Sequence, residues 1–128
     1  MKTLTLFTLF GSLLLFNCSN KTNSVPNQLK AELNKNDGQL FVIERNIPDA
    51  GQLTAEQLQS ISQTSCDVLD ELGNDIKWLH SYVTNDKVFC VYKASNESLI
   101  KAHAKKGGFP ADNIVAVSSI IDPETANK

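Results

Sequence analysis

The sequence predicts one small α+β domain, in which four β-strands and two α-helices follow one another in the order βαββαβ. Three observations lead to this fold class: short runs rich in β-branched and aromatic residues, two segments with apolar residues at helical spacing, and turn residues between them. Each βαβ half requires a right-handed crossover. We therefore expect a ferredoxin-like sandwich over residues 39–123, with a four-stranded antiparallel sheet and both helices on one face.

The first strand is predicted over residues 39–45. This QLFVIER run stands between Asp37-Gly38 and Pro48, which is how a buried strand is usually bounded. Glu44 shares a face with Leu40 and Val42, and Arg45 shares the other face with Phe41 and Ile43. The sequence alone leaves open which of the two sets faces the helices.

The first helix is predicted from Thr54 to about Leu72. Thr54 and Gln57 form a capping-box pattern, and Gly73 is expected to end the helix in a left-handed conformation. Cys66 lies at the flank of the expected inner face, so we expect it to be half-buried. That inner face comprises Leu58, Ile61, Ser65, Val68, Leu69 and Leu72.

A hairpin is predicted next, with strands over residues 76–84 and 87–94 joined by Asn85-Asp86. If Thr84 pairs with Lys87, the register and the two-residue period of strands place a set of aromatic and imidazole side chains on one face. This set is Trp78, His80, Tyr82 and Phe89, whereas Ser81, Val83, Val88, Cys90 and Tyr92 lie on the other face.

The second helix is predicted from Ser95, as its capping residue, to about Lys106. Gly107-Gly108 ends it. The last strand is expected over residues 113–121, and Asp122-Pro123 stops it, leaving residues 124–128 as a tail.

The N-terminus predicts export. Lys2 precedes an apolar stretch at residues 4–16 that is shorter than the roughly 20 residues of a membrane span, as in a signal peptide. Leu15-Phe16-Asn17-Cys18 places a cysteine where bacterial lipoproteins are cleaved and acylated. We therefore expect a signal peptide at 1–17, lipidation of Cys18 and localisation in the cell envelope. An uncleaved anchor or a soluble exported protein is the alternative.

Residues 18–38 are expected to form a disordered polar tether, because they are rich in Asn, Lys, Ser and Thr. The net charge of the chain is −2, and loss of Lys2 with the signal peptide would make it about −3. This balance argues against a nucleic-acid surface. Cys66 and Cys90 can be two thiols or one disulfide, and buried thiols are favoured.

Several side chains are candidate metal ligands. His80 is the first, because imidazole binds metals near neutral pH, although a hydrogen-bonded histidine in a subunit interface is the plainer interpretation. His103 on the second helix fits a core-edge histidine better than a ligand. Cys90 is a soft donor or a small buried hydrophobic residue. Glu44 and Tyr82 would add oxygen donors, although Glu44 suits a salt bridge equally well.

Strong catalytic and metal-binding motifs are absent from the sequence. There is no CxxC, HxxxH or HExxH spacing, no Gly-rich phosphate loop and no GxSxG segment. Gly107-Gly108 follows a helix, so it cannot offer free N-terminal amides to a phosphate. These absences favour a binding protein over a hydrolase.

Seven short blocks in the chain nevertheless resemble a family of small bacterial domains of unknown function, often named nickel-binding ferredoxin-like proteins. The resemblance spans nearly the whole expected domain. It implies a ferredoxin-like fold and the binding of nickel or another divalent transition metal. The blocks are 41–45 (FVIER), 80–84 (HSYVT), 86–87 (DK), 90–92 (CVY), 103–104 (HA), 108–110 (GFP) and 121–123 (IDP).

Three functions follow as hypotheses. The first is a non-enzymatic, envelope-anchored protein that sequesters a divalent metal, with membrane contact only through its lipid and with a homodimer as one candidate assembly. The second is an enzyme or small-ligand binder on the uncovered sheet face, with His80 as acid or base assisted by Tyr82 and Glu44. The third is a protein-interaction module that uses the same face.

Overall fold

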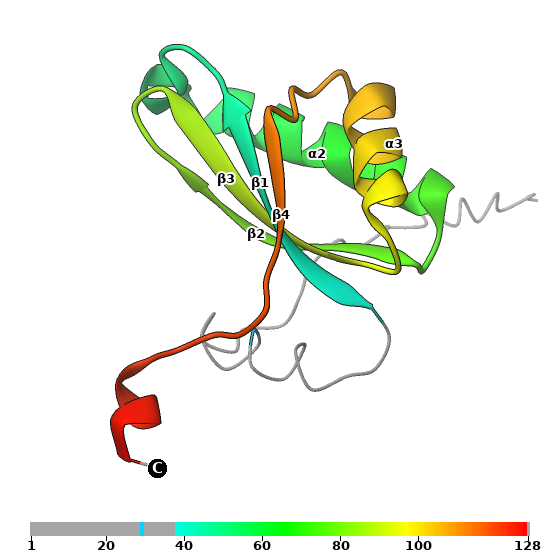
Figure 1. Cartoon of the computed structure of the whole chain (residues 1–128). Helices are drawn as coiled ribbons and strands as arrows, with labels where there is room; N and C mark the ends of the chain where they lie inside the picture. Colours follow the sequence, from blue (N-terminus) through cyan, green and yellow to red (C-terminus); the bar gives the residue numbers. More distant parts are fainter. Residues whose placement is uncertain (1–28, 30–37, 128) are drawn as a thin grey trace, which may run out of the picture.

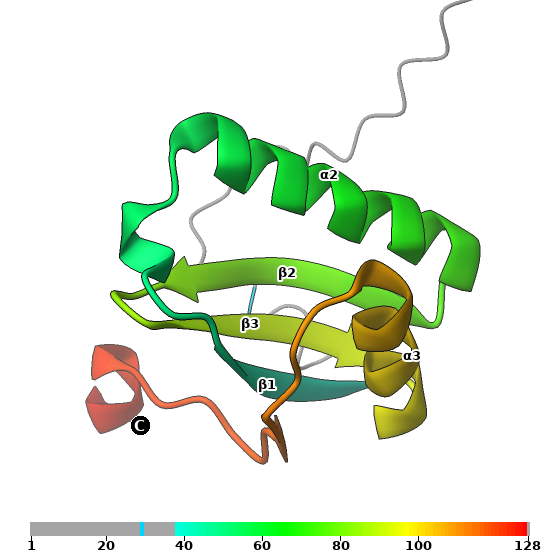
Figure 2. The same ribbon diagram turned by 90° about the horizontal axis from the view of Figure 1, so that it is seen from above.

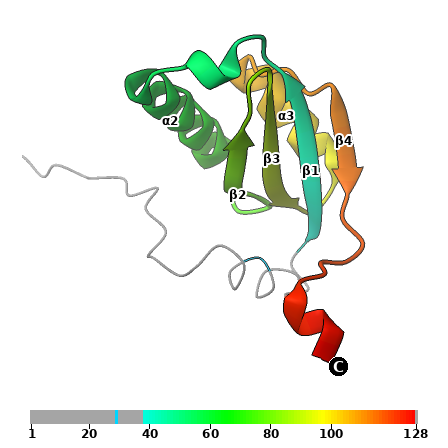
Figure 3. The ribbon, with the colours of Figure 1, turned by 90° about the vertical axis from the view of Figure 1, so that its left-hand side faces the viewer.

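The computed structural model describes residue 29 and residues 38–127. Its main elements are β1 (Gln39–Asn46), α2 (Ala55–Leu72), β2 (Ile76–Val83), β3 (Lys87–Ala94), α3 (Glu97–Gly107) and β4 (Asn113–Ala116), with 3-10 helices at Ala50–Gln52 and Pro123–Asn127. The strands form one antiparallel sheet in the order β2-β3-β1-β4. Both helices lie on the same side of this sheet (Figure 1, Figure 3), which confirms the ferredoxin-like α+β fold.

Helix α2 begins as its sequence predicts. The Thr54 hydroxyl accepts a hydrogen bond from the Gln57 backbone amide, and the Gln57 side chain accepts one from the Thr54 amide, which completes the capping box. Gly73 ends the helix at φ 84° and ψ −161°, so φ is positive as expected but ψ lies outside the left-handed helical region. Figure 2 shows α2 running along the sheet beside β2.

The hairpin of β2 and β3 has the predicted register at its turn, where the Thr84 amide donates to the Lys87 carbonyl. His80 lies opposite Val91 and Tyr82 opposite Phe89. The placement of Trp78 on the same face as His80 and Tyr82 was wrong. The register shifts between Trp78 and His80, and Leu79 is the extra residue of this bulge, so Trp78 pairs with Tyr92 on the helix-covered face.

Two further boundaries differ from the prediction. Asn96, not Ser95, caps α3, because its side-chain oxygen accepts from the Leu99 amide, whereas the Ser95 amide donates to Asp75. Strand β4 stops at Ala116 instead of residue 121. Ala116 pairs with Phe41 and the Val117 amide still donates to the Leu40 carbonyl, but β1 begins at Gln39, so the residues that follow soon run past the end of their neighbouring strand.

The hydrophobic core lies between the helices and the sheet. Arg45 shares this helix-covered face with the inward residues of β1, which settles the side that the sequence left open. Ile61, which was expected on the inner face of α2, is 40% exposed. Cys90 is a free, buried thiol as favoured, so no disulfide joins it to Cys66. Cys66 is disulfide-bonded, so the expectation of a second free thiol was wrong, and it is buried and not half-buried. The core cluster comprises Phe41, Ile43, Ile76, Cys90, Tyr92, Ala94 and Ile100.

Among the described residues, no helix is long and apolar enough to cross a membrane. The predicted signal peptide, the lipidation site at Cys18 and all but residues 29 and 38 of the expected tether lie outside the described residues.

Candidate functional site

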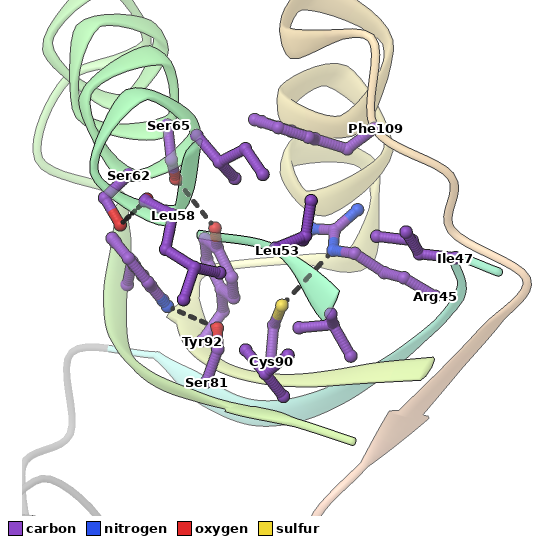
Figure 4. A pocket seen from close by; sticks show the side chains of 14 residues that line it. Arg45, Ile47, Leu53, Leu58, Ser62, Ser65, Ser81, Cys90, Tyr92 and Phe109 are labelled. Carbon is purple, nitrogen blue, oxygen red and sulfur yellow. Dashed lines mark hydrogen bonds between the residues drawn. The ribbon is translucent and has the colours of Figure 1, made fainter. Parts of the chain in front are cut away.

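A pocket opens between α2 and the helix-covered face of the sheet (Figure 4). Its volume is about 90 Å³, well above the roughly 15 Å³ that one water molecule requires. The walls are almost entirely apolar, which suits a small organic ligand better than a hydrated ion. The lining residues are Arg45, Ile47, Leu53, Leu58, Ile61, Ser62, Ser65, Trp78, Ser81, Val83, Val88, Cys90, Tyr92 and Phe109.

A buried hydrogen-bond network lies at the inner end of the pocket. The Ser65 hydroxyl is 3.0 Å from the Tyr92 hydroxyl and 3.1 Å from Nε2 of His103, and the Tyr92 oxygen is 3.5 Å from the same nitrogen. Burial raises the pKa of Tyr92 to about 12. Burial, with a smaller contribution from the charge of Arg45, lowers the pKa of His103 to about 4. All three groups are therefore neutral at pH 7, and they hold α2 and α3 against β3.

Arg45 supplies the charge in the pocket. The side chain is 3% exposed, and its guanidinium lies over the ring of Phe109, 5.3 Å from the centroid. Nε donates to the Cys90 sulfur at 3.3 Å, and Nη1 donates to the Pro110 carbonyl oxygen. Figure 4 shows the guanidinium between Phe109 and Cys90, with Leu53 beside it.

The opposite face of the sheet carries the other polar cluster. The rings of His80 and Tyr82 meet edge to face, with centroids 4.9 Å apart. Nε2 of His80 is buried and has no hydrogen-bond partner among the described residues, and desolvation lowers the pKa of this histidine below 6.5. Glu44 forms a salt bridge with Lys87.

The five predicted metal ligands fall into two groups on opposite faces of the sheet. His80, Tyr82 and Glu44 share one face, and the register places the latter two on either side of Phe89. Cys90 and His103 lie on the helix-covered side, where each already has a hydrogen-bond partner. Within the described residues, no three His, Cys, Asp or Glu side chains are grouped so that they could hold a metal ion.

Sequence reasoning missed the polar groups of the pocket. Arg45, Ser65 and Tyr92 are buried there, but none of them was a candidate. One signal was available for Arg45, because it shares a strand face with the apolar Phe41 and Ile43, and a charge on a buried face needs a compensating partner. Ser65 gave a similar signal, because it stands among apolar residues on the inner face predicted for the first helix, and no comparable signal pointed to Tyr92.

The family model described as "Nickel responsive protein SCO4226-like" matches residues 41–117. The chain belongs to this family. The crystal structure of SCO4226 from Streptomyces coelicolor A3(2) has a similar fold, with a TM-score of 0.54 and 16% sequence identity. The match covers 64% of this chain and 99% of that one. No curated protein matches the sequence.

These comparisons confirm the family that the sequence resembles and, independently, its fold. They also define a unit for experiments. A nearly complete solved protein corresponds to the folded region, and the core cluster lies between Phe41 and Ile100. Residues 38–127 contain every strand of the sheet and both helices that cover it, so we take residues 38–128 as the unit for experiments.

Proposed function

We propose that this chain is an envelope-anchored, non-enzymatic protein that binds and sequesters a divalent metal ion, with nickel as the first candidate. Membership of a family described as nickel-responsive supports a link to this metal. Within the described residues, the observation that carries the proposal is the imidazole of His80, whose Nε2 has no hydrogen-bond partner. A lone pair on a neutral imidazole is a ligand that nickel accepts readily.

The protonation state of His80 favours this role. Desolvation lowers its pKa below 6.5, so the ring is neutral at pH 7 and a metal need not displace a proton. Glu44 is on the same face and is partly exposed, so it can exchange Lys87 for a metal ion. These groups do not complete the coordination shell of a metal ion. We favour the same face of a second copy of the chain as the source of the remaining ligands. A homodimer is therefore part of the proposal.

Calorimetric titration of residues 38–128 with nickel, zinc, copper and cobalt tests metal binding. We expect saturable nickel binding that His80→Ala abolishes while the thermal midpoint stays close to that of the wild type. His103→Gln is the matched control, because it changes the histidine on the other side of the sheet, and it should retain nickel binding. Absence of nickel binding below about millimolar would refute the proposal. Loss in His103→Gln alone would move the site to the helix-covered face.

Envelope anchoring requires its own measurement. The full chain, expressed in a bacterium with labelled palmitate, should incorporate the label and sediment with membranes. Cys18→Ala should do neither. Unchanged sedimentation of the variant without label would favour an uncleaved anchor, and a soluble, unlabelled wild-type chain would refute lipidation.

The structure gives less support to the alternative in which a ligand binds around His80. The pocket lies on the helix-covered face, and its lining contains Trp78 but not His80, Tyr82 or Phe89. The pocket is therefore the place for a small-molecule site, and such a site would not involve the imidazole of His80.

A further inference from the structure

The pocket holds a buried positive charge without a counter-ion. Arg45 is 3% exposed and lines the pocket, yet no carboxylate pairs with it among the residues the structure describes. Two of its three guanidinium nitrogens have acceptors, and one of these is the Cys90 thiol, which is a weak acceptor. The guanidinium also lies within hydrogen-bonding reach of the Tyr92 hydroxyl, which is a neutral partner, so no described group supplies a compensating negative charge. A buried charge in this condition is unfavourable until an anion compensates it.

The hydroxyl groups around the pocket each have a hydrogen-bond partner already, and none of them carries a charge. Ser62 donates to the Leu58 carbonyl within α2, and Ser81 accepts from the indole nitrogen of Trp78. Ser65 is bonded within the network that contains Tyr92. The remaining surface is apolar or aromatic. The pocket thus combines one cation that needs a partner with walls that need only van der Waals contact.

We propose that this pocket binds a small organic monocarboxylate with an apolar body. The carboxylate lies against the guanidinium of Arg45, which can donate two parallel hydrogen bonds to it. The body packs between α2 and the sheet, against Leu58, Trp78 and Val88. This site is independent of the proposed nickel function, because the pocket and His80 are on opposite faces of the sheet.

The intrinsic fluorescence of the protein offers a direct test. Trp78 is the single tryptophan of the chain and lines the pocket, so a bound ligand should change its emission. Residues 38–128 are titrated with butanoate, hexanoate, octanoate and decanoate, and with the primary alcohols of equal length. We expect saturable binding in at least one pair, with the carboxylate bound at least about tenfold more tightly than the alcohol, since hydrogen bonds to charged groups are the stronger ones.

Two substitutions locate the binding. Ile61 lines the pocket and is 40% exposed, so Ile61→Trp should fill the pocket without disturbing the core. Val115 on β4 is 49% exposed and does not line the pocket, which makes Val115→Trp its matched control. Calorimetry, used here because both variants add a tryptophan, should show binding lost in Ile61→Trp and retained in Val115→Trp.

A third substitution tests the charge. Arg45→Gln should bring carboxylate binding down to the level of the alcohol and leave alcohol binding unchanged. If that variant does not fold, the proposal is decided by the preference of the wild type for carboxylate over alcohol and by the loss of binding in Ile61→Trp. Equal affinity for both members of a pair, or no saturable binding of any probe, overturns the proposal. Binding that survives Ile61→Trp also overturns it, because the probe would then occupy another place. Nickel titration of Ile61→Trp distinguishes failure of the carboxylate proposal from failure of the metal proposal, because filling the pocket should leave nickel binding unchanged.

Discussion

On the helix-covered side of the sheet, His103 of α3 and Tyr92 of β3 are 0% and 2% exposed and share a hydrogen-bond network with Ser65. On the opposite face, Tyr82 is 57% exposed, and Nε2 of His80 has no described partner. Each face thus carries one histidine and one tyrosine in contact with each other. The same pair of residue types is enclosed and hydrogen-bonded on one side, whereas on the other the tyrosine is exposed and the histidine nitrogen lacks a described partner, which is the premise of the proposed metal site.

The two histidines should differ most in their effect on stability. His103→Ala would leave a cavity in the core and remove a partner from Ser65, so we expect it to lower the free energy of unfolding by about 3 kcal/mol. His80→Ala should cost less than about 1 kcal/mol, because its side chain is only partly enclosed. Urea denaturation of the two variants measures both values. Equal losses would mean that the two faces do not differ in this way.

The pH dependence of stability should come from the enclosed face. The pKa of His103 is about 4 in the folded protein, against 6.5 as its ordinary value, so the unfolded chain binds the proton more readily. The contribution of the neutral ring is complete above pH 6.5 and is lost as the pH falls toward 4. The loss should reach about 2–3 kcal/mol.

Urea denaturation between pH 7 and pH 4 measures this dependence. In His103→Gln, which has no titrating ring, the decline over this range should be smaller by that amount. The groups nearest the ring are Arg45, whose charge persists throughout, and Tyr92, which stays neutral, so neither imitates the effect. An unchanged decline in the variant would assign the pH dependence to other groups.

Local features of the fold were predictable, because each depends on a few neighbouring residues. The capping box of Thr54 and Gln57 and the turn at Thr84–Lys87 were confirmed. The bulge at Leu79 was not predictable: no Gly or Pro marks it in the sequence of this strand, and only packing in three dimensions selects the register. The length of β4 likewise depends on where its neighbour β1 begins.

The candidate site was less predictable than the fold, because its geometry depends on how the strands pair and where the helices pack. His80, His103, Cys90 and Glu44 have donor atoms that the sequence reveals, but the face on which each lies depends on the folded sheet. The bulge moved Trp78 into the pocket and away from His80. The buried charge of Arg45 could only be assigned to a pocket once the helices were placed over its side of the strand.

The two tyrosines test the comparison of the two faces through the smallest expected changes in stability. Tyr92→Phe removes one hydroxyl from the buried network, while Ser65 keeps its bond to His103, so we expect a loss of about 1 kcal/mol. Tyr82→Phe removes an exposed hydroxyl and should change the free energy of unfolding by less than about 0.5 kcal/mol. Chemical denaturation of the pair at pH 7 gives both numbers. A loss in Tyr82→Phe as large as that in Tyr92→Phe would show that the face opposite the helices is enclosed in solution, as it would be in a homodimer, and that His80 is an interface residue before it is a ligand.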